Sequence, residues 1–233
     1  NPDRHVGDIA TIDYSQMELR VLAAISGETH MLQAFTDGED IHALTQRRVG
    51  LPSRTKAKNF NFGVSFGAQA PTLSETAGIP MTEAKAFLDA YWEAYPKYKQ
   101  YVDSLVVQVE ADGGCRNWAG RWRTIPKATN RNEKNRNMRL AMNTPIQGGA
   151  LDVAKQACVD LLPLLRLGEE VDIHPFEFLH DEVGFERGKD CPDDLTWQVF
   201  LDQAVEIMEA ANPFMDVDLP VTLSIASSWG DCK

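Results

Sequence analysis

The sequence predicts an α+β fold, on three observations. A short apolar run from Asp8 to Asp13 has the length and composition of a buried strand. Helical patterns with caps and breakers then fill most of residues 15–111. Near the end of the chain, two apolar arms flank an acidic centre over residues 176–186, which is the pattern of a β-hairpin.

The remaining elements follow from breakers and periodicity. Helices are expected over residues 15–25, 41–49, 53–67, 71–78, 82–95, 97–111 and 194–211, and a last strand over 221–226. Residues 116–126 are expected to form extended segments around a turn at Gly120. A long helical region over residues 133–162 is expected to be interrupted near Pro145 and Gly148-Gly149.

Composition limits the classes of function. With 233 residues and 43% hydrophobic content, the chain can bury a sizeable core. It contains no run of about 18 apolar residues, so no membrane span is expected. Its four cysteines are widely spaced, which argues against a zinc ribbon and fits a reducing compartment. The net charge of −11, taken alone, speaks against a nucleic-acid binder.

The charge is unevenly distributed, however. From Arg116 to Arg139, eight basic residues stand against one acid, Glu133, which gives a local charge of +7. We call these eight residues the basic stripe: Arg116, Arg121, Arg123, Lys127, Arg131, Lys134, Arg136 and Arg139. A basic stripe on an acidic chain is typical of a groove for a polyanion. The alternative is a solvated basic loop.

A second candidate site lies in the helix expected over residues 53–67. Arg54, Lys58, Phe62 and Phe66 follow one another at intervals of four and so share one helix face. A face that is half cationic and half aromatic suits a ligand with a polyphosphate at one end and a flat ring at the other. The alternative is an amphipathic helix with a phenylalanine core stripe and two capping charges.

Three further sets of polar residues stand at ends of elements or on one helix face. Asp13 ends the first strand, directly before a helix, where α/β sites tend to collect. The spacing of Ser15 and Glu18 is also that of a capping box. Two other sets are Arg139, Asn143 and Gln147, which would share a helix face, and His180, Asp181 and Glu182 at the hairpin tip. A solvent face and an ordinary acidic turn are the alternatives for these two.

Taken together and in order, these motifs resemble those of family A DNA polymerases. Asp13-Tyr-Ser-Gln-Met-Glu18-Leu-Arg20 resembles motif A, Arg54-x3-Lys58-x3-Phe62-Gly-x2-Phe66-Gly67 resembles motif B, and His180-Asp181-Glu182 resembles motif C. Asp40-Ile41-His42 and Arg139-x3-Asn143-x3-Gln147 also fit the family's order. The resemblance runs over nearly the whole chain.

The resemblance implies a polymerase palm with an antiparallel sheet, formed by residues 1–33 and 116–233, and mostly helical fingers over 34–115. The thumb and any exonuclease are expected to be absent from these residues, so a second polypeptide is expected to supply the thumb and the start of the palm. Phe66 departs from the family, which often has tyrosine there, so a hydroxyl contact near the template base would be missing. The short connection from His42 to Arg54 is similar to that of some phage members.

For the chemistry, the resemblance implies template-directed DNA synthesis by a two-metal phosphoryl transfer. Asp13, Asp181 and the backbone carbonyl of Tyr14 would hold two Mg²⁺ ions, for which Mn²⁺ could substitute. Lys58 would be catalytic at the triphosphate. Other contacts to the incoming dNTP are expected from His42, Arg54, Phe62, Glu18 and Gln16, with Glu18 crowding the 2′ position of the sugar.

The resemblance also assigns residues to the primer–template DNA. These are Phe66, Arg139, Asn143, Gln147 and His180, with Glu182 in a supporting role. The expected location is the cytoplasm of a bacterium or of a phage-infected host cell.

Two alternatives to a DNA polymerase can be weighed from the residues. A single-subunit RNA polymerase shares the metal-binding aspartates, but the bulky acid Glu18 argues against a site that must tolerate ribose. A non-catalytic DNA-binding or assembly subunit would be expected to have lost Asp13, Asp181 or Lys58, and all three are present.

Overall fold

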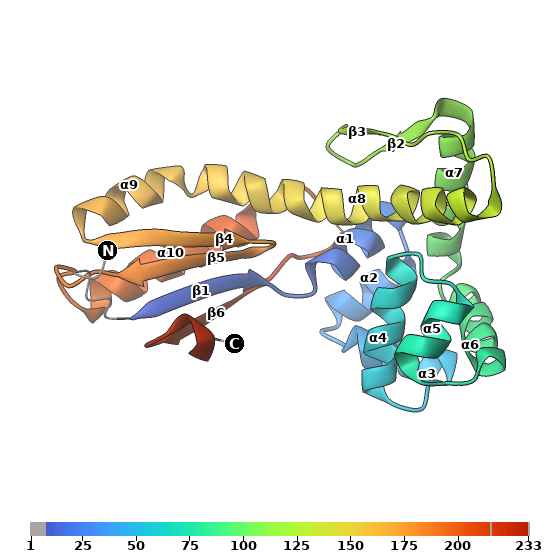
Figure 1. The fold of residues 1–233 in the computed structure, drawn as a ribbon. Coiled ribbons are helices and arrows are strands. Elements are labelled where there is room, and N and C mark those ends of the chain that lie inside the picture. The colour runs from blue at the N-terminus through green and yellow to red at the C-terminus, as the bar shows by residue number, and fades with distance from the viewer. Residues whose placement is uncertain (1–7, 215, 233) are drawn as a thin grey trace. The chain divides into compact units, whose positions relative to one another are not determined.

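A computed structural model describes residues 8–214 and 216–232 and confirms the α+β class. The chain forms two compact units, one from residues 1–17 and 150–233 and the other from 18–149. Figure 1 shows the elements of both units along the chain. The unit limits differ from the expected boundaries at 33/34 and 115/116, and the palm and fingers labels stay a prediction.

The first unit is built on a four-stranded antiparallel sheet in the order β4-β5-β1-β6. Its strands are β1 (Ile9–Tyr14), β4 (Ile173–Leu179), β5 (Glu182–Arg187) and β6 (Val221–Ala226). β1 lies centrally, with Ile12 opposite Val183 and Asp13 opposite Glu182. The expected strands over residues 8–13 and 221–226 are confirmed.

One face of this sheet is covered by helices. The helices α9 (Leu162–Glu170) and α10 (Asp194–Ala210) contact each other and the edge strands β4 and β6. Phe185 of β5 meets Phe200 of α10 edge-to-face, with ring centroids 5.3 Å apart. The Tyr14 hydroxyl donates to the carbonyl of Met208 in α10 at 2.5 Å. Because side chains alternate along a strand, Asp13 points to the opposite face.

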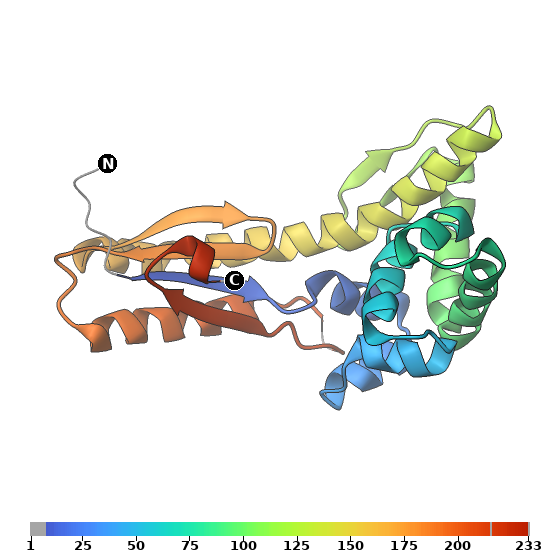
Figure 2. The ribbon, with the colours of Figure 1, turned by 60° about the horizontal axis from the view of Figure 1, so that its bottom comes forward.

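On that opposite face, the 3-10 helix η1 (Trp229–Asp231) lies beside β1 and β5 (Figure 2). No pattern in the sequence indicated η1, which is one short turn. None indicated α9 as a separate helix either, because the expected helix ended at residue 162 and residues 163–170 were assigned to no element.

The hairpin expected over residues 176–186 is confirmed, with longer arms. β4 and β5 pair from Ile173–Arg187 to Leu179–Glu182, which leaves His180 and Asp181 as a two-residue turn. His180 has φ +58°, a conformation that only glycine adopts freely, so the turn is held by the strands rather than by local preference. The acidic tip is therefore a tight two-residue turn between paired strands.

The second unit is mostly helical. Its helices are α1 (Met17–Ser26), α2 (Thr29–Thr36), α3 (Ile41–Val49), α4 (Arg54–Ser65), α5 (Ala70–Ala77), α6 (Met81–Ala94) and α7 (Pro96–Asp112). All of these except α2 were expected. The strands β2 (Gly114–Arg116) and β3 (Trp122–Thr124) form a small hairpin around Gly120, as expected.

The helix α2 was missed because its N-cap is a glutamate, which the preferred-cap rules do not select. The buried Glu28 side chain accepts from the His30 amide at 3.2 Å. Its other carboxylate oxygen accepts from the amides of Lys97 and Tyr98 at 2.9 and 3.3 Å, at the start of α7. One carboxylate therefore caps two helices, and both helix dipoles favour its negative charge.

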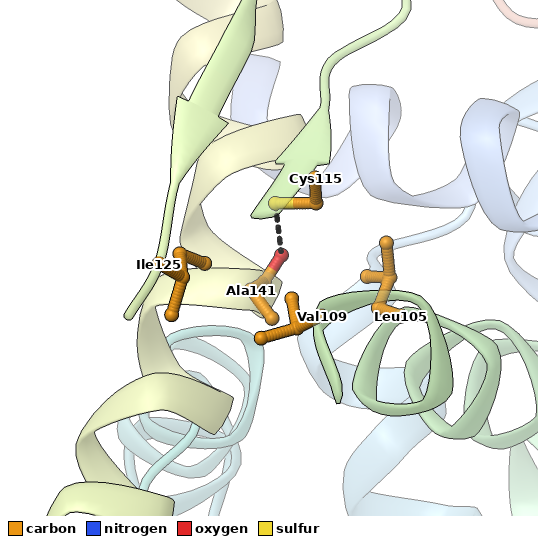
Figure 3. Packing of buried hydrophobic residues seen from close by; sticks show 5 residues of the cluster. All are labelled: Leu105, Val109, Cys115, Ile125 and Ala141. Atoms are coloured by element: carbon orange, nitrogen blue, oxygen red, sulfur yellow. Dashed lines mark hydrogen bonds between the residues drawn. The ribbon is translucent and has the colours of Figure 1, made fainter. Parts of the chain in front are cut away.

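The helix α8 (Arg131–Asp160) runs without a break, so the interruption expected near Pro145 and Gly148-Gly149 is wrong. Proline has no N–H, which leaves the Ala141 carbonyl without its usual helical donor. The Cys115 thiol lies 4.0 Å from that oxygen and donates to it (Figure 3). Cys115 and Ala141 also pack with Leu105, Val109 and Ile125 in a buried cluster, which holds the proline-containing turn in place.

Candidate functional site

The acid pair Asp13 and Asp181 is the chemical centre of the first unit. Asp13 stands near the end of β1, opposite Glu182, and Asp181 lies in the β4–β5 turn directly before Glu182. Burial, together with the charges of Asp181 and Glu182, raises the pKa of Asp13 to about 6. Burial also raises the pKa of Asp181. Two neighbouring carboxylates repel one another once both are ionised, and a bound cation would relieve this repulsion.

The neighbours of the pair are held by their own contacts. Glu182 Oε1 accepts from Trp229 Nε1 at 3.2 Å, and the Tyr14 amide donates to the Asp181 carbonyl at 3.4 Å. Gln16 has φ +55° and is exposed, and His180 is exposed in the turn. The structure thus brings Asp13, Tyr14, Asp181 and Glu182 together.

The donor set of the pair fits a hard divalent cation. Within the described ranges, no cluster of three or more His, Cys, Asp or Glu side chains is arranged to hold a metal ion. Mg²⁺ does not require one, because it is usually bound by one or two carboxylates while waters and substrate phosphates complete its shell. The carboxylates of Asp13 and Asp181 and a backbone carbonyl are oxygen ligands of this kind.

In the second unit, α4 has two distinct faces. Ala57, Phe60, Asn61 and Val64 are fully buried and form its core stripe. The other face has exposed Arg54 and Lys58, followed by half-buried Phe62 and Phe66. The two rings stack with centroids 6.2 Å apart. Phe62 and Phe66 are thus only partly buried and follow the two cations along one side of α4, and the use of this side as a ligand face stays a prediction.

An ion pair joins the start of α4 to the start of α3. The Arg54 guanidinium pairs with Asp40 through Nε at 2.7 Å, and Asp40 caps α3 by accepting from the amides of His42 and Ala43. Burial raises the pKa of Asp40, but the Ala43 amide and Arg54 outweigh it, so the net pKa falls. This pairing holds Arg54 and His42 on neighbouring helix starts.

His42 is buried, and its ring centroid lies 5.7 Å from that of Phe62. Burial lowers the pKa of His42, and the positive charges of Arg54 and Lys58 lower it further, against the opposing effect of Asp40. The imidazole is therefore neutral at pH 7.

Sequence reasoning missed the buried polar group behind His42. The Asn61 amide nitrogen lies 3.0 Å from His42 Nδ1, and the Thr45 hydroxyl donates to Asn61 Oδ1 at 3.0 Å. The Tyr95 hydroxyl lies 2.7 Å from that of Thr45. The available signal was two polar residues, Thr45 and Asn61, at core-facing positions of their helices.

The predicted set on α8 lies on one helix face, with Arg139 and Gln147 exposed and Asn143 half-buried. Arg139, the first residue of this set, lies against Gly67 just after α4. A Cβ on Gly67 would come within 3.2 Å of the Arg139 Cα. Gly67 has φ +77°, so glycine is required there both by the backbone conformation and by the close approach of Arg139. The Asn143 Oδ1 atom is buried and has no hydrogen-bond partner within the described chain, so it can accept a donor from a ligand.

All eight residues of the basic stripe are exposed. The Arg116 guanidinium stacks over the Trp122 ring at 5.2 Å, and Trp118 Nε1 donates to the Gly149 carbonyl at 3.1 Å. Trp118 therefore joins the β2–β3 turn to α8 and Trp122 packs within the hairpin, while the cations remain open to solvent.

The predicted residues fall into both units. Asp13, Tyr14, Gln16, His180, Asp181 and Glu182 belong to the first, and Glu18, His42, Arg54, Lys58, Phe62, Phe66, Arg139, Asn143 and Gln147 to the second. Among the described residues, no helix is long and apolar enough to cross a membrane.

The chain is similar to proteins of one known family. The model of DNA polymerase family A matches residues 2–231. DNA polymerase I of Bacillus subtilis (strain 168) is 36% identical over 97% of this chain and 26% of its own length. The thermostable DNA polymerase I of Thermus aquaticus is 34% identical over 97% of this chain and 27% of its own. The chain thus spans about a quarter of the length of these relatives.

The fold is also similar to that of a solved structure. It is the polymerase domain of Pol1 from M. smegmatis, in complex with DNA primer–template and dNTP. It superimposes with a TM-score of 0.87 at 27% identity, covering 97% of this chain and 41% of that one.

Proposed function

Because the chain belongs to DNA polymerase family A, we propose that it carries out template-directed DNA synthesis. The primer 3′-hydroxyl attacks the α-phosphate of a dNTP, the bond to the β-phosphate breaks, and pyrophosphate leaves. The observation that carries the proposal is the pair of acids Asp13 and Asp181, which a central strand and the adjoining hairpin turn of a family A fold bring together. The M. smegmatis domain, solved with primer–template and dNTP, supports the choice of substrates.

Asp13, Asp181 and the Tyr14 carbonyl would hold two Mg²⁺ ions, or Mn²⁺ in their place. When bound, such ions stabilise negative charge on the attacking and leaving oxygens. Glu182 adds negative charge beside the pair and holds Trp229, which is a supporting role.

The accessible face of α4 binds the nucleotide. Lys58 neutralises the triphosphate and gives a proton to the leaving pyrophosphate, while Arg54 and His42 hold the β- and γ-phosphates. Phe62 packs on the sugar. Glu18 crowds the 2′ position and so excludes ribonucleotides, and Gln16 completes the nucleotide set.

Primer–template DNA is bound by a second group of residues. Arg139, Asn143 and Gln147 contact the minor groove, where donors and acceptors read base edges. Phe66 lies next to the template base and His180 next to the primer end. The basic stripe contacts phosphates.

The division into palm (1–33 and 116–233) and fingers (34–115) is part of the proposal, as are a cytoplasmic location and a partner polypeptide. The partner is supported by strand β4 at the edge of the sheet, where Phe176, Phe178 and Leu179 are each about 40% exposed. Edge strands with apolar side chains are usually covered. Gel filtration of this chain, followed by primer extension with and without a copurified partner, tests this point.

The test of the function is single-nucleotide incorporation by Asp13→Asn and Asp181→Asn variants. Each variant should lose incorporation by several orders of magnitude while primer–template affinity stays within a few-fold of wild type. Asp202→Asn, an exposed acid on α10 of the same unit, is the matched control and should retain full activity. Near-normal turnover in either active-site variant would disprove the assignment.

A further inference from the structure

We propose that Asn61 is a positioning residue that holds His42 as the tautomer with its proton on Nε2. The inference rests on the assignment of His42 to the phosphates of the nucleotide. It concerns Asn61, Thr45 and Tyr95, to which the sequence pattern assigned no role, and its evidence is a chain of buried hydrogen bonds.

The first step is that the neutral His42 ring has one N–H proton, which is on either Nδ1 or Nε2. A neutral imidazole donates from one ring nitrogen and accepts at the other. Burial and the nearby cations Arg54 and Lys58 keep His42 neutral, with Asp40 the acid that opposes them. The tautomer therefore decides whether His42 can donate to a phosphate oxygen, because the other tautomer would present a lone pair to it.

The second step is that Asn61 selects the tautomer. Its Nδ2 lies 3.0 Å from His42 Nδ1, and an amide nitrogen can only donate. Nδ1 must then accept, which leaves the proton on Nε2. Within the described chain, Nδ1 is the ring nitrogen with a protein partner.

The third step is that Thr45 and Tyr95 fix the orientation of the Asn61 amide. A flipped amide would reverse the tautomer, so the direction of this chain of bonds matters. The Thr45 hydroxyl lies 3.0 Å from Asn61 Oδ1 and 2.9 Å from the Ile41 carbonyl oxygen, so these two acceptors share its one proton. The Tyr95 hydroxyl lies 2.7 Å from Thr45 Oγ1 and donates to it, because the Thr45 proton is directed to the Asn61 and Ile41 oxygens. When Thr45 donates to Asn61 Oδ1, proton donation runs from Tyr95 through Thr45 and Asn61 to His42, and the Asn61 amide is held with its nitrogen toward the ring.

Asn61 and Thr45 are fully buried and belong to different helices, α4 and α3, and Tyr95 lies between α6 and α7. The bonds therefore join the helix that carries Lys58 and Phe62 to the helix start that carries His42. A network in which each member is satisfied is rigid, and breaking one link leaves a buried polar group unpaired.

The direct test is the ring nitrogen spectrum of ¹⁵N-histidine-labelled protein at pH 8, with the His42 signals identified by their loss in His42→Ala. Wild-type His42 should show a pyridine-type Nδ1 and a protonated Nε2. In Asn61→Asp the ionised carboxylate cannot donate, so the proton should move to Nδ1. Thr45→Val, which removes the hydroxyl but keeps the shape, should give a mixture, while Thr45→Ser should match wild type.

A protonated Nδ1 in the wild-type protein would overturn the proposal. So would a tautomer unchanged in both Asn61→Asp and Thr45→Val. If Asn61→Asp does not fold, the Thr45 pair alone decides, because Thr45→Ser keeps the hydroxyl that Thr45→Val removes.

The functional arm measures the affinity of a Mg²⁺–dNTP complex. Asn61→Asp should weaken it about tenfold or more, the loss expected for one hydrogen bond to a charged group. The same change in a His42→Ala background should add nothing. If His42→Ala itself has no effect, the nucleotide-site assignment fails. If His42→Ala weakens binding but Asn61→Asp does not, or if the losses add, positioning by Asn61 fails.

Discussion

At the scale of single residues, ionisation of Asp13 beside Asp181 destabilises the folded protein. The raised pKa of Asp13, about 6 against an ordinary 3.8, means that the folded chain binds its proton more tightly than the unfolded chain does. The stability this proton provides is complete below pH 4 and is lost as the pH rises through about 6. A cation that binds the pair would remove this destabilisation at neutral pH.

Asp13→Asn should therefore stabilise the metal-free protein at pH 7 by about 1–2 kcal/mol, a figure discounted because Asp13 is half-exposed. The gain should vanish at pH 4, where the wild-type acid is protonated. Urea unfolding in a chelator at both pH values is the measurement. Adding Mg²⁺ should raise the stability of the wild type and leave Asp13→Asn unchanged. A difference between the two proteins that does not vary with pH would contradict the explanation.

At the scale of elements, the two faces of α4 separate structure from chemistry. Lys58 is exposed on the face that includes Phe62, whereas Lys56 lies half-buried near the N-cap Ser53. Lys58→Ala should slow single-turnover incorporation by about 10²–10³, as expected for loss of one preorganised charge. Lys56→Ala is the control and should change the rate less than about threefold. A defect confined to nucleotide affinity would show that Lys58 binds the triphosphate without assisting the chemical step.

The unbroken helix α8 gives a second prediction at this scale. Cys115→Ala removes the donor to the Ala141 carbonyl and should lower the free energy of unfolding by about 1–2 kcal/mol, because a hydrogen bond is removed and a space is left. In a Pro145→Ala background the restored N–H serves that carbonyl, so the same change should cost less. Thermal unfolding of the four proteins gives the coupling, and Cys158→Ala on α8 is the control. Strict additivity would mean that the thiol does not replace the missing bond.

Most of these elements could be predicted from the sequence. Periodicity and breakers predicted α3, α4, α6, α7 and α10, because each of these helices buries a stripe that repeats at the helix period, and the strands were predicted from apolar runs and turn signals. They failed at α2, whose cap Glu28 bonds residues some 70 positions away, and at Pro145, whose missing bond is supplied by Cys115. The residues behind His42 were missed for the same reason: hydrogen bonds from Asn61 to Thr45 and Tyr95 are tertiary facts that no local pattern contains.

At the scale of the whole chain, charge is divided between the two units. The first unit has 21 acidic and six basic residues, a net charge of −15, and the second has 13 acidic and 17 basic residues, a net charge of +4. The overall −11 therefore hides a basic surface, because eight exposed cations are concentrated in the basic stripe. A polyanion should be held by the second unit and repelled by most of the first.

This division predicts how salt acts on DNA binding. Replacing Arg123, Lys127 and Arg131 by serine should weaken primer–template binding about 10- to 100-fold at low salt. Each cation removed from a phosphate lowers the slope of log affinity against log salt by about 0.9, so the slope should fall by about two to three. The weakening should be the same for any DNA sequence, since phosphates are common to all.

The matched control is the triple change Lys155, Arg166 and Lys189 to serine in the first unit, which alters the net charge by the same amount at three exposed positions. Long-range repulsion from the acidic unit is screened beyond about 10 Å at 0.1 M salt. The control should therefore leave the slope unchanged and reduce affinity less than about threefold at that salt. Equal reductions in the two triple variants would mean that net charge, and not phosphate binding by the stripe, sets the affinity. A reduction confined to the stripe variant, with the shallower slope, would assign DNA binding to residues 116–139.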